Sequence, residues 1–428
     1  MSLIADLQSV EPGQPVEPKP ALSRRTFLLA AAATTLLGGR SAVTGAEANS
    51  ATARARKKSA SPAASSDDSS TPRVWKSNKR LLAFRRRVLS FDPARANTGW
   101  LDVVMAQGAA RCGVSLEDEA LLRWATAWAD HHLGVPIGEK RDSNSGLLDP
   151  GKPSRGIYLN SYCGDWGAPL ALAPLHQHQP KPAYLDVITR TADHIMDKAV
   201  RAPDGTICHA AGLGVWVDTL YYTASVLAHA HAATGTRRYA EEAVRQCLLH
   251  AKHLRDEHTG LFFHDLDLKT GARTRSFWAR GNGWIILSLA DTLALVPKET
   301  EGREQVLATY RSQVEGLLKL QHATGLWRIV PEEPNAHLET SGTTMVLGGL
   351  VAGVAAGWLP KTHSEPLRRG FAELLTWING NGQLMGSQHP AGGGGWETHK
   401  LSGIGEDTYT SGAFLRLVAD LGKANLVE

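Results

Sequence analysis

Twelve stretches of the 428-residue chain carry apolar residues at helical spacing, and this regularity limits the possible folds more than any other feature. In one stretch, for example, Val306, Tyr310 and Val314 fall on a single helical face. Strand-like alternation is rare and short. We therefore expect helices near residues 78–91, 98–111, 117–132, 166–177, 184–200, 217–233, 237–256, 282–296, 303–321, 341–356, 364–379 and 408–422.

The connections between these stretches alternate in length. Short connections such as Thr234-Gly235-Thr236 close one end of successive helix pairs. The long connections, which carry Gly, Pro and aromatic residues, are 141–164, 201–216, 258–281, 323–340 and 381–407. This pattern predicts an all-α fold, an (α/α)6 barrel in which six hairpins form a ring and each buries one face against its neighbours. The long loops would gather at one mouth, where a functional site is expected.

The first 48 residues have the features of an export signal. Ser23-Arg24-Arg25-Thr26-Phe27-Leu28 is a twin-arginine pattern, and Ala46-Glu47-Ala48 fits a cleavage site. The mild apolar run from Leu28 to Leu37 is too short to span a membrane. The sequence therefore predicts a twin-arginine signal peptide at 1–48, delivery to the periplasm or outside the cell, and no integral membrane span.

Residues 49–76 are rich in Ala, Ser and Pro and are predicted to be a disordered basic linker, with the catalytic domain at 77–428. Eleven basic and three acidic residues lie between Arg54 and Asp92, although the net charge of the whole chain is only +4. No nucleic-acid motif accompanies this local charge. We interpret it as a solvated charge run and expect no nucleic-acid partner.

The four cysteines, Cys112, Cys163, Cys208 and Cys247, do not have the spacing of metal ligands. An exported protein could join two of them, and Cys163 with Cys208 is then the expected pair. Folding in the reducing cytoplasm before export makes buried free thiols equally consistent with the sequence.

The stretch Ser276-Phe277-Trp278-Ala279-Arg280-Gly281-Asn282-Gly283-Trp284 holds two of the chain's twelve Trp, one Arg and two Gly within nine residues. Arg280 and Trp284 are four residues apart, so they share a face if the stretch is helical. An Arg between two indoles is suited to a sugar acid, because the guanidinium grips the carboxylate and the rings cover apolar sugar faces. A packed Trp–Arg cluster in the core accounts for the same residues equally well.

Three further motifs accompany this stretch in a fixed order. They are Trp216-Val217-Asp218-Thr219-Leu220-Tyr221, Gly260-Leu261-Phe262-Phe263-His264 and Glu339-Thr340-Ser341. With these motifs, the chain from about residue 95 to its end resembles the unsaturated uronyl hydrolases of glycoside hydrolase families 88 and 105, and family 105 looks the closer. The resemblance implies an (α/α)6 barrel that hydrates an unsaturated sugar acid without a metal or cofactor.

The resemblance assigns Asp218 the role of catalytic acid and base. Trp216 and Tyr221 would surround it with apolar surface, which raises the pKa of a carboxyl group and keeps it protonated near neutrality. A proton donor needs that state. The residues alone favour a plainer role for Asp218, the N-cap of a helix that starts beside Thr219.

A second family Asp lies upstream of this motif, where Asp165 is the only carboxylate of its segment. We assign Asp165 a catalytic role through the resemblance. Two alternatives stay open: Asp165 could cap the helix that starts at Trp166, and Asn160 could hold the family position instead. Glu339 is expected to cap a helix, and 391–395 to form a flexible loop.

The resemblance also assigns the substrate-binding residues. Arg280 would bind the uronate carboxylate, and His264 would hydrogen-bond the sugar ring or the attacking water. Trp278 and Trp284 would stack on the sugar or line the pocket. His209 is a less clear match, because its distance from Asp218 along the chain is shorter than is usual in the family.

The predicted substrate is an oligosaccharide whose non-reducing end is a 4,5-unsaturated uronic acid left by a pectin-type lyase. Asp218 would protonate C4, water would add at C5, and the resulting hemiketal would open and release the aglycone. Two other functions stay open. One is a toroidal polysaccharide lyase or sugar epimerase, which needs a Tyr or His base near the site and for which Tyr162 and Tyr222 are candidates; the other is an inactive carbohydrate-binding protein.

Overall fold

A computed structural model describes residues 71–143, 145–390, 396–400, 402–424 and 426 of the chain. The predicted signal peptide at 1–48, most of the predicted linker at 49–76 and the predicted flexible loop at 391–395 lie outside these residues. The regular secondary structure of the described residues is almost entirely helical, as the spacing of apolar residues predicts.

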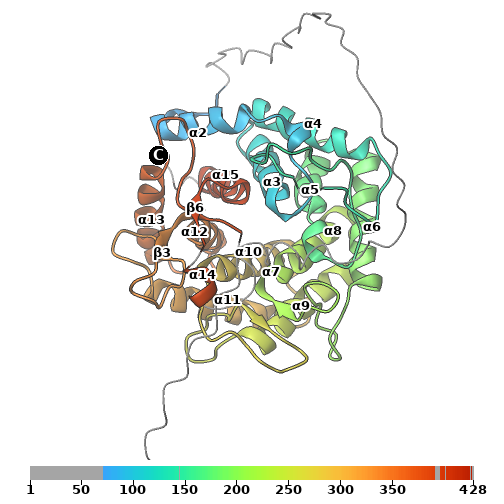
Figure 1. Cartoon of the computed structure of the whole chain (residues 1–428), viewed down its shortest axis with the longest axis vertical. Helices are drawn as coiled ribbons and strands as arrows, with labels where there is room; N and C mark the ends of the chain where they lie inside the picture. Colours follow the sequence, from blue (N-terminus) through green and yellow to red (C-terminus); the bar gives the residue numbers. More distant parts are fainter. Residues whose placement is uncertain (1–70, 144, 391–395, 401, 425, 427–428) are drawn as a thin grey trace, which may run out of the picture. The chain divides into compact units, whose positions relative to one another are not determined.

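Six inner helical segments form a closed ring in which each packs against the next (Figure 1). The last of them packs against the first, which closes the ring. In chain order they are α3 (Trp100–Ser115), α5 (Ala168–His178), the continuous run α7 (Val217–Leu220), η3 (Tyr221–Ser225) and α8 (Val226–Thr234), then α10 (Ala279–Leu295), α12 (Thr340–Ala355) and α15 (Thr408–Lys423).

Six outer helices alternate with the inner ones along the chain and surround them (Figure 1). They are α2 (Lys79–Leu89), α4 (Glu119–Leu133), α6 (Pro182–Lys198), α9 (Arg237–Leu254), α11 (Arg303–Lys319) and α13 (Ser364–Thr376). An outer helix such as α9 buries only one side, whereas inner α10 is buried from Ala279 to Leu293. This difference in burial is what separates the two layers and confirms the (α/α)6 barrel.

The long loops precede the N-terminal ends of the inner helices. In the described residues, the first of three short antiparallel ribbons joins two of these loops, and each of the other two lies within a single loop. β1 (Val215–Trp216) pairs with β2 (Asp265–Leu266), β3 (Trp327–Arg328) with β4 (Leu338–Glu339), and β5 (Ser387–Gln388) with β6 (Ile404–Gly405). Because inner and outer helices alternate in direction, all the inner helices begin at this same end. The loops therefore build one mouth.

The remaining elements are short. They are α1 (Arg73–Lys76), η1 (Pro93–Arg95), η2 (Cys163–Asp165), η4 (Lys361–His363) and α14 (Trp396–His399). Trp75 in α1 is fully buried, which joins residues 73–76 to the helical domain although the predicted boundary lay at residue 77. Among the described residues, no helix has the length and apolar character needed to cross a membrane.

All four cysteines are buried free thiols, so the structure has no bond between Cys163 and Cys208. Glu339 caps α12 as predicted: its carboxylate accepts hydrogen bonds from the backbone N–H groups of Ser341 and Gly342, each at 2.6 Å. These two N–H groups would otherwise lack an intrahelical acceptor.

Candidate active site

Asp218 lies in the first turn of α7, directly after strand β1. The ribbon that β1 forms with β2 sets Trp216 opposite Asp265, and the backbone N–H of Val217 donates to the carbonyl of His264 at 3.0 Å. This pairing brings the His264 ring to Asp218, with 3.6 Å between Nε2 and the carboxylate Oδ2. Two motifs that are distant in the sequence therefore meet at one carboxylate.

Five rings form a row through the site. His209 stacks on Trp216 with their centroids 4.4 Å apart, and Trp216 meets the edge of the His264 ring at 5.2 Å. On its other side His264 lies 4.4 Å from Trp278, which in turn stacks on His399 at 5.0 Å. Three of the predicted substrate-binding residues, His209, His264 and Trp278, thus belong to one continuous layer beside Asp218.

Arg280 is buried in the first turn of α10, and its guanidinium lies 4.5 Å above the ring of Trp278. Its Nη1 donates to the carbonyl of Gln388 at 2.5 Å, to the hydroxyl of Tyr409 at 3.0 Å and to that of Ser341 at 3.3 Å. Nε has no hydrogen-bond partner among the described residues. One nitrogen thus fixes the guanidinium, while the buried Nε is left without an acceptor in that part of the chain.

The pKa of Asp218 is lowered, which differs from the predicted rise. Burial alone would raise the pKa, but the hydrogen bond and the electrostatic interaction with His264, together with the charge of Arg280, outweigh burial. Tyr221 does not wall the carboxyl group as expected, because it is fully buried and its hydroxyl donates to Gln107. The local sequence shows the apolar neighbours of Asp218 but not the cationic groups that other loops bring.

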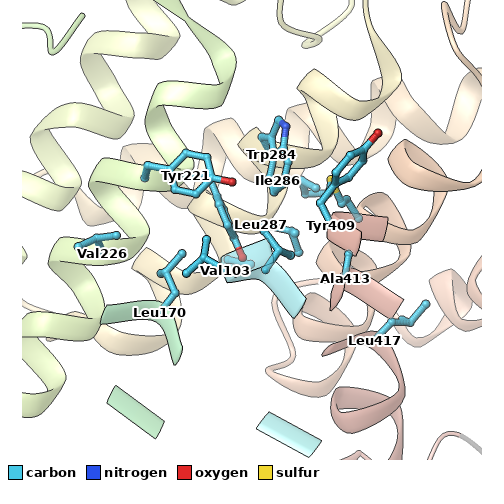
Figure 2. Close-up of a cluster of buried hydrophobic side chains, with 14 of the residues drawn as sticks. Val103, Leu170, Tyr221, Val226, Trp284, Ile286, Leu287, Tyr409, Ala413 and Leu417 are labelled. Carbon is cyan, nitrogen blue, oxygen red and sulfur yellow. The ribbon is translucent and has the colours of Figure 1, made fainter. Parts of the chain in front are cut away.

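Trp284 lies in the core, away from the sugar-facing position expected for it. The side chain is fully buried, and its ring centroid is 4.8 Å from that of Tyr221 in the cluster of Figure 2. Four residues along a helix correspond to an axial rise of about 6 Å. Trp284 is therefore about one turn deeper in the barrel than Arg280, where it packs in the core beneath the site.

Asp165 and Asn160, which the sequence left as alternatives, lie side by side. Asn160 Nδ2 donates to one carboxylate oxygen of Asp165 at 2.8 Å, and Arg141 forms an ion pair with the other. Burial raises the pKa of Asp165, although the Arg141 charge opposes this rise. Asp165 does not cap the following helix, because Gly167 is the N-cap of α5 and no side chain caps it.

His209 is held in one orientation by two contacts of its Nδ1, at 3.3 Å from the Cys163 sulfur and 3.2 Å from the Thr219 hydroxyl. Burial lowers the pKa of His209 to about 4, although the nearby charge of Asp218 acts in the opposite direction. The imidazole is therefore neutral near pH 7 and serves as part of the ring layer rather than as a fixed cation.

Sequence reasoning missed three residues that hold the site together: Arg141, which pairs with Asp165, and Gln388 and Tyr409, which hold Arg280. None of the three lies in a quoted motif, so no local signal marks them. Gln388 also accepts a hydrogen bond from the indole N–H of Trp278 at 2.6 Å. In the described part of the chain, no group of three or more His, Cys, Asp or Glu side chains could hold a metal ion.

Solved structures share this fold at low sequence identity. A possible member of the GH105 family from Klebsiella pneumoniae is 20% identical, with a TM-score of 0.68 over 80% of this chain and 93% of that chain. Another possible GH105 member, from Salmonella enterica, is 22% identical, with a TM-score of 0.66 over 75% of this chain and 82% of that one. An unsaturated glucuronyl hydrolase specific for heparin is 12% identical, with a TM-score of 0.60 over 82% of this chain and 97% of that one.

Curated relatives match part of the sequence. An unsaturated rhamnogalacturonyl hydrolase of Bacillus subtilis is 24% identical over 49% of this chain and 62% of its own length. An unsaturated 3S-rhamnoglycuronyl hydrolase of an Alteromonas species is 27% identical over 41% of this chain and 44% of its own length. The chain thus spans less than two thirds of each of these relatives. The family model described as Glycosyl Hydrolase Family 88 matches residues 77–421, and the chain therefore belongs to that family.

Proposed function

We propose that this protein is a glycosidase that removes a 4,5-unsaturated uronic acid from the non-reducing end of lyase-generated oligosaccharides. The observation that carries the proposal is the contact of Asp218 with His264, at a mouth where the buried Nε of Arg280 has no acceptor among the described residues. The names of the two curated relatives agree with a substrate of this class.

Substrate binding would prepare Asp218 for proton transfer. The uronate carboxylate would bind the guanidinium of Arg280 and cancel part of the positive charge that lowers the Asp218 pKa. The sugar would also exclude water from the carboxyl group, which favours its neutral form. Both effects raise the pKa of Asp218, so that it can take up the proton that it then donates.

The reaction follows from the electron distribution of the substrate, whose C4=C5 double bond is conjugated to the ring oxygen as an enol ether. Asp218 donates its proton to C4, and positive charge develops at C5 and the ring oxygen. Water attacks C5 and returns a proton to the Asp218 carboxylate, which acts as base. The hemiketal then opens and frees the aglycone, so a second carboxylate flanking the anomeric carbon is unnecessary.

The lyase or epimerase alternative requires a Tyr or His base, and the surroundings of the two tyrosine candidates argue against a tyrosine in that role. The Tyr222 hydroxyl donates to the carbonyl of Trp100 at 3.1 Å and its ring is buried in the core. Burial and the nearby negative charges raise the pKa of Tyr162, which keeps that hydroxyl protonated. An inactive binding protein would have no need of a carboxylate 3.6 Å from an imidazole nitrogen, as Asp218 is from His264.

The test is incubation of the purified protein with a panel of lyase digests while the absorbance of the conjugated unsaturated acid is followed. The name of the Bacillus relative makes a rhamnogalacturonan digest the first choice, and a pectin digest and glucuronan-type digests complete the panel. We expect the absorbance to fall with at least one digest. An increase with intact polysaccharide would indicate a lyase, and no change with any digest would contradict the proposal.

We further propose that the protein is exported by the twin-arginine route to the periplasm or beyond. The Ser23–Leu28 pattern supports this proposal. Replacement of Arg24 and Arg25 by Lys should leave the protein in the cytoplasmic fraction, whereas the unchanged chain should be found in the periplasmic or culture fraction. Equal export of both forms would contradict it.

A further inference from the structure

Tyr162 is a mouth residue for which the mechanism above has no use. It lies in the loop directly before η2, and its side chain is partly exposed. Its backbone N–H donates to Asn160 at 2.9 Å, but its hydroxyl makes no hydrogen bond within the part of the chain that the structure describes. The hydroxyl of a tyrosine usually forms a hydrogen bond, so a bound ligand is a candidate acceptor for the Tyr162 hydroxyl.

The ring of Tyr162 is fixed by its neighbours. It meets the His209 ring edge-on, with their centroids 5.3 Å apart. Its other neighbour is Gly164, where an added Cβ would lie 2.6 Å from the ring atoms Cε1 and Cζ and 2.7 Å from the hydroxyl oxygen. A side chain at residue 164 would therefore displace the ring, and Gly is the residue that lets it lie there.

The hydroxyl is a donor rather than a base. Burial raises the pKa of Tyr162, and the negative charges of Asp218 and Asp165 raise it further. Because both carboxylates affect the Tyr162 pKa, the phenol hydroxyl lies close enough to Asp218, the proposed proton donor, and to Asp165 to interact with their charges.

Tyr162 and Arg280 lie on different sides of the site. Arg280 is packed among groups of α10, α12 and α15, whereas Tyr162 contacts His209 and the turn that precedes α5. In a six-membered sugar ring, C5 carries the carboxylate and C2 is opposite it, with C3 beside C2. A uronate held by its carboxylate at Arg280, with C4 at Asp218, would turn its free hydroxyl groups toward Tyr162.

We propose that Tyr162 is a specificity-determining residue that donates a hydrogen bond to a ring hydroxyl of the bound uronate, on the side remote from its carboxylate. This inference rests on the proposed function. A sugar hydroxyl both accepts and donates, so it can accept from the phenol while it donates to a neighbouring carboxylate. Recognition of this kind selects sugars that carry a free hydroxyl at that position.

Tyr162→Phe tests the proposal because it removes one oxygen and keeps the ring. With a digest that the unchanged enzyme consumes, we expect KM to rise about three- to tenfold, the effect of one neutral hydrogen bond, with the melting temperature unchanged. Tyr158→Phe is the matched control in the same loop, because its hydroxyl donates to the Arg155 carbonyl at 2.7 Å, and it should keep the unchanged KM.

Gly164→Ala gives an independent reading, because the added methyl group should displace the Tyr162 ring and raise KM while the hydroxyl is still present. Tyr162→Phe with an unchanged KM would overturn the inference, and so would a loss confined to kcat. These results are distinct from failure of the proposed function, in which the unchanged enzyme itself would leave every digest intact.

Discussion

At the scale of the residue, the protonation of Asp218 is set by side chains from other parts of the chain. His264 reaches it from another loop and Arg280 from the start of α10, and their interactions with the carboxylate lower a pKa that burial would raise. The free enzyme therefore holds Asp218 as a carboxylate near neutrality. In the proposed mechanism it becomes a proton donor only when an anionic sugar binds beside it, so proton uptake is tied to the presence of substrate.

This arrangement predicts the direction of the pH dependence. Above a lowered pKa, the protonated fraction of Asp218 in the free enzyme falls about tenfold for each pH unit. Because kcat/KM reports ionisation of the free enzyme, we expect it to fall as the pH rises from about 5 to about 8. A pH series of initial rates measures this, and a kcat/KM that rises over the same range would contradict the assignment.

The residues of the site differ in how far sequence could predict them. Asp218, His264 and Arg280 lie in motifs whose order carries the family resemblance, and the structure gathers them. Their supports could not be predicted, because the ties are non-local: Arg280 bonds Gln388 and Tyr409, which are 108 and 129 residues away in the chain. A pattern within one segment contains no information on such pairs.

At the scale of the element, the mouth loops are fixed to the inner helices by buried polar side chains. Asn282 in α10 is the clearest case. Its Nδ2 donates to the Phe262 carbonyl and its Oδ1 accepts from the Phe262 N–H, both at 2.9 Å. Phe262 is two residues before His264, so this pair of bonds positions the loop that carries the imidazole to Asp218.

Asn282→Ala should therefore weaken both the fold and the site. It leaves two buried backbone groups of Phe262 without partners, which should lower the free energy of unfolding by about 2–4 kcal/mol in a urea titration. The rate with a consumed digest should also fall, because His264 loses its support. Asn381→Ala is the control on the exposed surface and should change neither. Equal stability of both variants would show that the two hydrogen bonds between Asn282 and Phe262 contribute nothing to the free energy of unfolding.

Helix boundaries and local winding are features of the elements that the sequence did not predict. We expected a helix near 282–296, but α10 begins at Ala279, because Asn282 and its partners bury a Gly-containing turn that resembles a loop in sequence. Similarly, the helix expected at 217–233 contains a π-helical turn at Tyr221–Ser225. Apolar spacing marks a helix, but packing against other segments sets its ends and its local winding.

At the scale of the whole molecule, a buried ionic network joins helices across the ring, deeper than the mouth. Asp291 of α10 accepts two hydrogen bonds from Arg416 of α15, at 2.7 and 2.9 Å. Arg111 of α3 approaches the same carboxylate at 3.6 Å, and both Asp291 and Arg416 are almost fully buried. The twelve-helix pattern predicts the ring itself, but not these charges that connect its opposite sides.

Asp291→Asn should be strongly destabilising, because it removes the carboxylate that pairs with both Nη atoms of the buried Arg416 and leaves the more distant Asp420 carboxylate, 3.7 Å from Nε, as its counter-ion. We expect a loss of about 3–5 kcal/mol in the free energy of unfolding near pH 7, measured by denaturant titration. Asp186→Asn, whose side chain is exposed on α6, is the matched control and should lie close to the unchanged protein. A variant as stable as that control would show that the network adds no stability.

The ion pair of Asp291 and Arg416 also predicts that the protein loses stability at low pH. Although burial opposes it, the Arg416 charge helps to lower the Asp291 pKa to about 2 from its usual 3.8. A lowered folded-state pKa contributes stability above the unfolded pKa, and this stability is lost as the pH falls from about 4 through about 2. The stability difference between the unchanged protein and Asp291→Asn should therefore narrow over that range. A constant difference would contradict this linkage.

The account depends on Asp218 as the proton donor to C4 of an unsaturated uronate. The most direct measurement is the loss of conjugated absorbance from a consumed digest by the Asp218→Asn variant, beside the unchanged enzyme. We predict that the variant abolishes this loss while its melting temperature changes little. A variant that keeps its fold and still removes the absorbance at the original rate would contradict the central claim.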